Sequence, residues 1–90
     1  VPHATCGITV NENADPNVLN DMLQQLDCMV PSRQPFYKHA EGNSAAHLKA
    51  SLMGCSLHLI VTCGHLNLGV WQSVYLCEFD GPRMRRVYVA

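Results

Sequence analysis

The fold is decided by the stretch TCGITVNENADPNVLNDMLQQL, residues 5–26. Residues 5–10 alternate, with an apolar side chain at every second position from Cys6, and this period of two predicts a half-buried strand. A polar Asn-Glu-Asn-Ala turn follows. Asp15 and Pro16 then open a helix, because Asp is a favoured N-cap residue and Pro fits the first helical position. The stretch therefore predicts a strand that leads directly into a helix.

Two helices are predicted in the first 54 residues. The first ends before Pro31 and carries one apolar stripe at helical spacing. A loop over residues 31–43 separates it from the second helix. Ser44 is a plausible cap for that helix, which runs to Met53 and has Gly54 where a C-terminal glycine is expected. The stripe of the first helix consists of Val18, Leu19, Met22, Leu23 and Leu26.

The last 36 residues are predicted to form strands, because they alternate and are rich in β-branched and aromatic residues. Turns are expected at Cys63-Gly64 and at Asp80-Gly81-Pro82. The order of elements predicts a single α+β domain over residues 1–90, with two helices packed on a mixed or antiparallel sheet. The expected strands are 57–61, 65–68, 70–79 and 84–89.

The composition excludes several classes of protein. Only 13 of the 90 residues are charged and the net charge is −1, so bulk attraction to nucleic acid or to an anionic membrane is not expected. No apolar run approaches the roughly 20 residues of a membrane span. So few charges in a small domain favour association with copies of itself. Five cysteines with no C-x-x-C spacing favour a reducing cytoplasm over a disulfide framework.

The five histidines are the first indication of chemistry. His3, His39 and His47 stand in loops or near the ends of elements, where functional groups tend to be placed. Three imidazoles from separate elements could hold a divalent metal ion with an open position. The alternative is scattered surface or capping histidines, since no H-x-x-x-H pair occurs. His58 and His65 lie on or between strands and are interpreted as structural.

Other polar residues form two further candidate groups. Glu12 in the turn after the first strand could be a general base or a metal ligand, although such turns often cap only their own backbone. Lys49, or the arginines at 83, 85 and 86, could bind a phosphate ester; the alternative for the arginines is a charged edge strand. Gln72, beside Trp71, could offer an amide to a ligand, unless the pair is simply part of the core.

Several motifs resemble the YjbQ-like family, of the kind named secondary thiamine-phosphate synthases. They are ordered along nearly the whole chain. The matching stretches are GITVNENADP (7–16), EGN (41–43), AHLKASLMG (46–54), 56–64, Gly69, WQ (71–72), YLCE (75–78) and DGPR (80–83).

The resemblance implies a homotrimer with a histidine from each of three motifs clustered near the subunit boundary as a metal or anion site. By position these histidines are His3, His39 and His47, and the metal would be Zn or Mg/Mn. Glu12 and Lys49 match family motif positions and are expected to be catalytic. The family's name implies a transferase that joins a pyrimidine diphosphate to a thiazole phosphate and expels pyrophosphate. Residues expected to bind the phosphorylated substrate are Asn11, Asn13, Gln72 and Arg86.

Four positions depart from the family pattern. Ala4 and Val70 stand where Thr is usual, Ala45 where Asp often stands, and Ser73 where Gly is usual. Lost polar groups could remove a substrate hydrogen bond or a partner that orients a ligand histidine. The alternative is therefore a non-catalytic trimeric binding or scaffold protein. A third possibility is a fragment of a longer enzyme, because family chains have about two strands ahead of His3.

Overall fold

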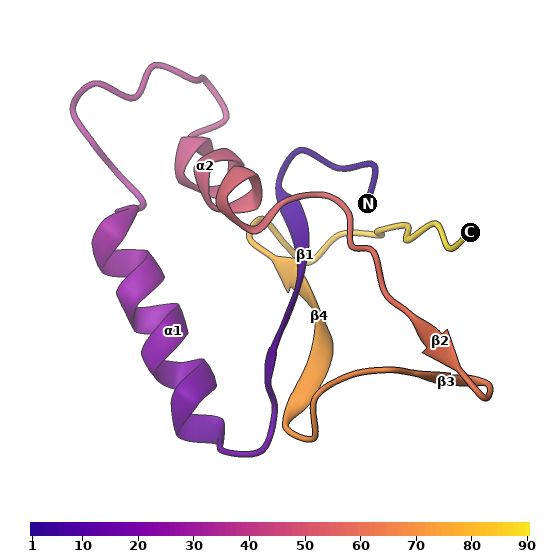
Figure 1. Cartoon of the computed structure of the whole chain (residues 1–90). Coiled ribbons are helices and arrows are strands. Elements are labelled where there is room, and N and C mark those ends of the chain that lie inside the picture. The colour runs from indigo at the N-terminus through magenta and orange to yellow at the C-terminus, as the bar shows by residue number, and fades with distance from the viewer.

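A computed structural model describes all 90 residues, and its centre is an antiparallel pair of long strands (Figure 1). β1 (Cys6–Glu12) pairs with β4 (Gln72–Glu78), from Cys6 opposite Glu78 to Glu12 opposite Gln72. The β4 residues alternate between exposed and half-buried, as a strand with one covered face does. The β1–β4 pair joins the start of the chain to its last third, and both helices lie between these strands in the sequence.

α2 (Ser44–Met53) packs directly against β1. Its buried residues are the small ones, Ala45, Ala46 and Ala50. On the strand side, a Cβ at Gly7 would lie 2.7 Å from the Cβ of Met53, so only glycine allows this approach. The Ile8 N–H also donates to the carbonyl of Gly54 at 3.0 Å. Small residues on both elements therefore bring helix and strand into contact.

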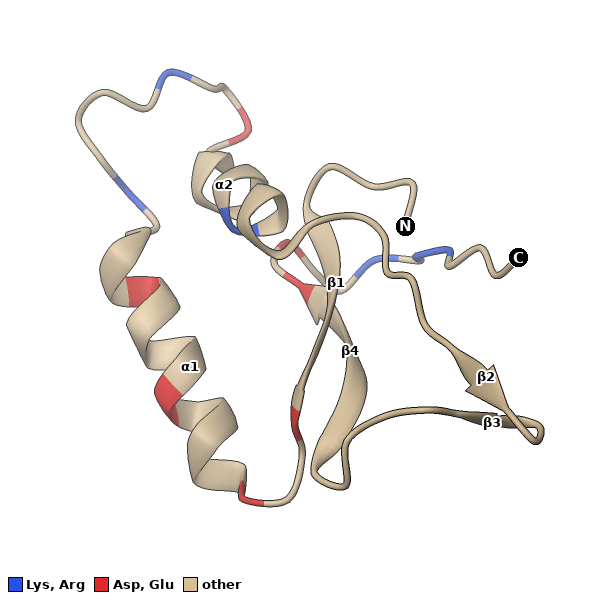
Figure 2. Cartoon of the chain, in the orientation of Figure 1, with Lys and Arg blue, Asp and Glu red and all other residues tan.

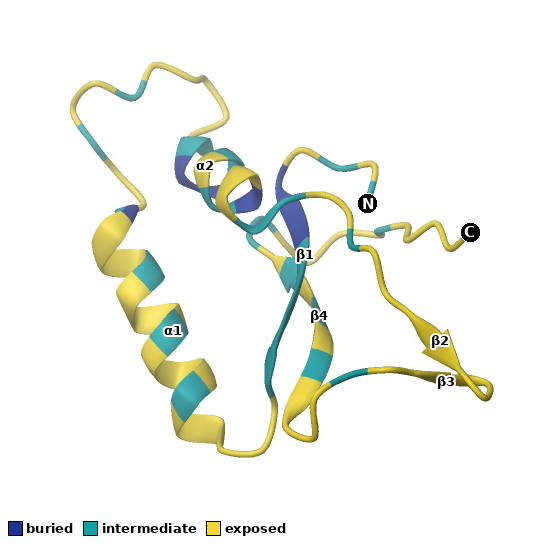
Figure 3. Ribbon diagram, viewed as in Figure 1, coloured by how far each residue is buried: buried dark blue, intermediate teal, exposed yellow.

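α1 (Pro16–Met29) begins as predicted, with Asp15 Oδ1 accepting a hydrogen bond from the Asn17 N–H at 2.9 Å. Its last residue is Met29, and Val30, the residue before Pro31, is the C-cap. None of the residues of α1 is buried, and its half-buried positions lie along one side (Figure 3). The predicted apolar stripe therefore faces the sheet without being packed tightly against it.

A small hairpin projects from the other side of the molecule (Figure 1). β2 (Val61–Thr62) pairs with β3 (His65–Leu66) through the predicted Cys63-Gly64 turn, in which both residues have positive φ. The hairpin forms a two-stranded sheet of its own, apart from β1 and β4. The helices of the chain are too short or too polar for any of them to cross a membrane.

The structure confirms an α+β fold and both helices, and it corrects several predicted boundaries. The expected single sheet is two separate antiparallel pairs. Residues 84–89 form no strand, and residues 57–60 are extended without a ladder partner. Ser44 is the first residue of α2 rather than its cap, which is Asn43. The strand predictions failed because β-branched residues form a strand only when a neighbour completes the ladder.

Candidate functional site

His39 and His47 lie side by side at the N-terminal end of α2. Their ring centroids are 5.6 Å apart and the rings are nearly perpendicular, at 85°. His39 is exposed in the loop before the helix, and His47 is half-buried in the first turns of α2. Tyr37, Ser44 and Leu48 complete an open hollow around the two rings. This hollow is the part of the molecule where predicted site residues meet.

The spacing of this pair suits a shared metal ion. Two imidazole nitrogens bound to one tetrahedral Zn²⁺, each at about 2.0–2.1 Å, place their ring centroids roughly 5 Å apart. The observed centroid separation of 5.6 Å is close to that value, and His39 is exposed. Neutral imidazole is also the ligand that zinc and most divalent transition metals accept. Two ligands of a metal site therefore fit here.

His3 does not join the pair. Its Nε2 accepts a hydrogen bond from the backbone N–H of Arg86 at 2.7 Å, so in the neutral ring the proton is on Nδ1. No group of three His, Cys, Asp or Glu side chains in the chain is arranged to hold a metal ion. The three-histidine cluster expected from the sequence is therefore not formed within one chain.

The acidic and amide candidates lie at the opposite end of the sheet from Asp80 and the start of α2. Glu12 pairs with Gln72 at one end of the sheet, and Cys6 pairs with Glu78 at the other. The two ends of a seven-residue strand are about 20 Å apart. The Glu12 carboxylate has no hydrogen-bond or ion-pair partner in the chain. Within a single chain, Glu12 therefore cannot act at the histidine pair.

The neighbours of Glu12 are engaged in the turns around them. Asn11 Oδ1 accepts a hydrogen bond from the Glu12 N–H at 2.7 Å. Asn13 accepts from the Tyr75 hydroxyl at 3.0 Å, and Gln72 Oε1 accepts from the Gly69 N–H at 2.7 Å. These bonds stabilise the local backbone, which is the alternative to a catalytic or binding role for such polar turns.

Lys49 is already paired. Its Nζ lies 2.5 Å from Asp27 of α1 and 5.9 Å from the centre of the Phe79 ring, and its side chain is 12% exposed. The ion pair therefore links α2 to α1 across the edge of the molecule. In this arrangement Lys49 has a structural role, and it could reach a phosphate only by leaving Asp27.

The arginines after β4 lie beside the acidic residues that end that strand (Figure 2). Arg85 forms two bonds to the Glu78 carboxylate, at 2.7 and 2.5 Å, and a third to the hydroxyl of Thr5 at 2.9 Å. Arg83 pairs with Asp80 at 3.0 Å. The guanidinium of Arg86 has no partner in the chain and is exposed. Of the three, Arg86 alone is free to bind an anion.

Hydrogen bonding to the Arg85 guanidinium is the main cause that lowers the pKa of Glu78 to about 2; the bond from the Asp80 N–H and the charges of Arg85 and Arg83 contribute to the same shift. A carboxyl with a lowered folded-state pKa contributes stability above its unfolded pKa, and that contribution is lost as the pH falls toward the folded value. The protein is therefore expected to lose stability between about pH 4.3 and pH 2. The effect is modest because a third of the Glu78 side chain is exposed.

Urea unfolding at about pH 6 and pH 3 tests this expectation. The Glu78→Gln variant should lose less stability than the unaltered protein over this interval, because its amide does not titrate. An equal loss in both proteins would assign the acid sensitivity to other carboxyls.

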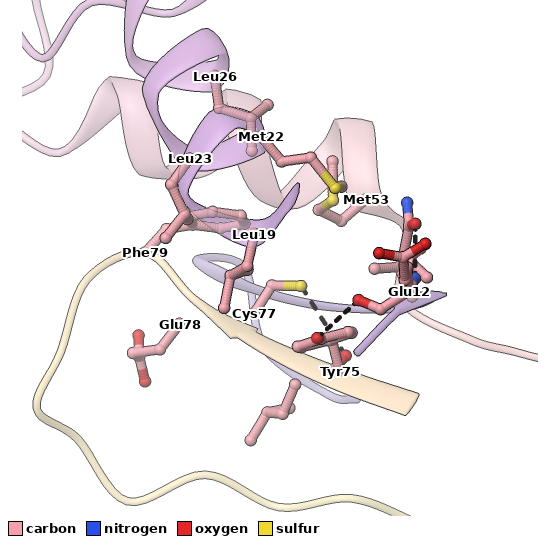
Figure 4. Close-up of a pocket in the computed structure, with 13 residues that line it drawn as sticks. Glu12, Leu19, Met22, Leu23, Leu26, Met53, Tyr75, Cys77, Glu78 and Phe79 are labelled. Carbon is pink, nitrogen blue, oxygen red and sulfur yellow. Dashed lines mark hydrogen bonds between the residues drawn. The ribbon is translucent and has the colours of Figure 1, made fainter. Parts of the chain in front are cut away.

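A separate cavity of about 210 Å³ lies between α1 and the sheet. Most of its lining is apolar, from Leu19, Met22, Leu23, Met53 and Phe79, and Figure 4 shows these side chains converging from both layers. Burial raises the pKa of the Cys77 thiol at its floor, and the neighbouring Cys6 raises it further. The thiol is therefore held neutral and unreactive, and the cavity is where the stripe of α1 fails to reach the sheet.

Residues that sequence reasoning missed are Asn43, Glu78 and Asp80. Asn43 Nδ2 donates to Asp80 Oδ2 at 2.8 Å, across 37 positions of the sequence. The available signal was that the two acidic residues Glu78 and Asp80 are followed within a few positions by three arginines, since opposite charges so close in sequence can pair. That signal could identify the Arg83 and Arg85 pairs, but it could not identify Asn43.

Comparison with known proteins shows one consistent likeness. A family model described as "UPF0047 protein YjbQ-like" matches residues 1–90. The UPF0047 protein YugU of Bacillus subtilis is 54% identical over 88 residues, covering 98% of this chain and 67% of the relative.

Two crystal structures agree with the fold. An uncharacterised YjbQ/UPF0047 family protein of Clostridium acetobutylicum has a TM-score of 0.86 at 58% identity, covering 91% of this chain and 63% of that one. A conserved hypothetical protein of Thermus thermophilus has a TM-score of 0.89 at 54% identity, covering 92% and 66%. The chain thus spans about two thirds of the length of its relatives.

Proposed function

The chain belongs to the YjbQ-like UPF0047 family, and from that premise we propose that it is a homotrimeric enzyme that binds a divalent metal ion between histidines at the subunit boundary and acts on phosphorylated small molecules. The observation that carries this proposal is the His39–His47 pair, with ring centroids 5.6 Å apart in an open hollow. An open hollow leaves room for further ligands and for a substrate, as a catalytic metal site requires.

In the proposed trimer, a second subunit supplies what one chain lacks. His3 is separate from the pair, and Glu12 is at the other end of the sheet. In a trimer the third imidazole is His3 of a neighbouring copy, which exchanges its bond to the Arg86 N–H for the metal. Glu12, Asn11, Asn13 and Gln72 of a neighbour then line the same site.

Exposed apolar surface supports association. Large apolar residues at the C-terminal arm and the outer side of β4 are uncovered, including Val74, Val87 and Tyr88. Between these residues and the hairpin lies a concavity with a volume of about 440 Å³, and its lining is almost wholly apolar. Monomeric proteins rarely expose such continuous patches. Covering this face with a second copy would bury it and complete a core that has only seven buried residues.

In the proposed chemistry, a bound divalent metal would polarise a phosphoryl oxygen or stabilise a departing pyrophosphate. The free guanidinium of Arg86 binds a phosphate oxygen, and Lys49 adds a second positive charge once it leaves Asp27. Glu12, whose carboxylate is unpaired, is the general base where the attacking group is water or a hydroxyl, and it takes the proton of that group as phosphate or pyrophosphate departs. A thiamine-phosphate-type transfer, in which a pyrimidine diphosphate is joined to a thiazole phosphate, is the specific reaction that we propose from the family resemblance.

The second candidate is a non-catalytic trimeric scaffold. It is favoured by three positions at which a polar family residue is replaced here by an apolar one, Ala4, Ala45 and Val70. Ala4 is exposed and Val70 is 86% exposed, whereas Ala45 is buried in α2. None of the three side chains can form a hydrogen bond to a substrate. The same trimer and the same histidine pair serve both candidates, and they differ only in turnover.

The test is elemental analysis, sedimentation and turnover on one untagged preparation. We expect stoichiometric metal, a trimer, and metal-dependent release of phosphate or pyrophosphate from a panel of phosphate esters. A metal-loaded trimer without turnover would favour the scaffold. A metal-free protein that also fails to take up zinc would overturn the metal site itself.

A further inference from the structure

Asp80 lies in the turn after β4 and joins two segments far apart in the sequence. Its Oδ2 accepts a hydrogen bond from Asn43 Nδ2 at 2.8 Å and another from Arg83 Nη2 at 3.0 Å. The Asp80 side chain is only 25% exposed, so water competes little for this oxygen. Bonds to an ionised carboxylate are stronger than neutral ones. Asp80 therefore fastens Asn43 to the end of the sheet.

Asn43 is the joint between the two histidines of the pair. Its backbone carbonyl accepts the N–H groups of Ala46 at 3.0 Å and His47 at 3.3 Å, which begins α2. Just before it, a turn closes where the Gly42 N–H donates to the carbonyl of His39 at 3.1 Å. A rotation at Asn43 therefore changes the angle between the loop that carries His39 and the helix that carries His47.

The side chain of Asn43 does not act as an ordinary N-cap. An Asn at this position normally accepts a hydrogen bond from an amide of the first turn. Asn43 makes no such bond, and its Oδ1 is buried without a hydrogen-bond partner. An unpartnered buried acceptor costs free energy. The Asn43 Nδ2 group donates to Asp80 at 2.8 Å and, over a longer distance, to Glu41 Oε2 at 3.4 Å. The shorter bond, to the Asp80 carboxylate, therefore holds this amide, and the helix does not.

We propose that Asp80 is a positioning residue for the His39–His47 pair and acts through Asn43. This inference rests on the proposed function, since it gives Asp80 a role at the same metal site. Partners that orient metal ligands from outside typically contribute about 10–100-fold to metal affinity. Asp80→Ala is therefore expected to weaken zinc binding by about 10–100-fold.

The experiment measures two quantities on the 90-residue protein. One is the zinc affinity, by titration with zinc alone. The other is the set of imidazole NMR signals in the metal-free protein, with His58 and His65 as internal references. Asp80→Asn keeps an acceptor for Asn43 and should lose less affinity than Asp80→Ala. Asn43→Asp keeps an N-cap residue but removes the donor to Asp80, so it should show the same loss of zinc affinity as Asp80→Ala. It therefore tests the same contact if Asp80→Ala folds poorly.

The matched control is Asp21→Asn, which removes the same charge from an exposed residue of α1 that forms no ion pair. Movement of the His39 and His47 signals in Asp80→Ala, with those of His58 and His65 unchanged, supports the positioning role. The NMR signals test the positioning role even if the unaltered protein binds no zinc. Absence of zinc binding would overturn the metal site but not the role of Asp80 in placing the two histidines. Signals and affinity that match those of Asp21→Asn would overturn the positioning role.

Discussion

Replacement of His47 by alanine is expected to abolish stoichiometric metal binding. His47 supplies one of the two imidazoles that the chain brings together, and the open hollow around them contains no carboxylate or thiol that could replace it. Loss of an outer partner typically costs about 10–100-fold in metal affinity, so loss of a ligand should cost more than about 100-fold. Elemental analysis of untagged protein and a zinc titration measure this loss.

His58→Ala is the matched control, because it also removes one imidazole but from an exposed position in the segment before the hairpin. Thermal unfolding of both variants should stay close to that of the unaltered protein, since the His47 side chain makes no hydrogen bond. Retained zinc in His47→Ala would place the metal elsewhere. If His47→Ala loses zinc but keeps its turnover, the proposal that the protein is a metalloenzyme is wrong.

The helices were predictable because their signals are local. Asp15 and Pro16 start α1, and Gly54, with φ of +89°, ends α2 as the sequence indicated. Each of these residues fixes backbone geometry within one turn. Of the expected strand 57–61 only Val61 lies in a strand, and 84–89 forms none, because strand formation depends on a distant partner that apolar alternation cannot specify.

The candidate site was predictable only in its residue types. The sequence singled out His39 and His47, but loop closure over residues 31–43 decides that their rings meet. The sequence analysis assigned Lys49 and the arginines to phosphate binding and did not predict their ion pairs. For Lys49 the partner, Asp27, is 22 residues away in the sequence. Asn43 looked like part of a motif, and only the fold shows that it contacts Asp80.

Replacement of Gly7 by alanine is expected to destabilise the protein, because the added methyl group overpacks the contact between β1 and α2. The new Cβ would lie 2.7 Å from the Cβ of Met53 and 3.1 Å from the carbonyl oxygen of Gly54, and neither atom is the free end of a flexible side chain. α2, which carries the buried alanines of a very small core, would have to move away from β1. Overpacking of this kind costs about 1–3 kcal/mol, measurable by urea unfolding.

Gly69→Ala is the matched control, because its Cβ would meet only the side chain of Gln72, which can turn away at the cost of one exposed hydrogen bond to the Gly69 N–H. The two variants add the same methyl group, so a difference between them isolates the contact of β1 with α2. Because α2 also carries His47, a displaced helix should weaken zinc binding in Gly7→Ala and leave it intact in Gly69→Ala. Equal stability of the two variants would mean that the helix does not pack on the strand as closely as these distances require, and that the histidine pair is placed by the loop alone.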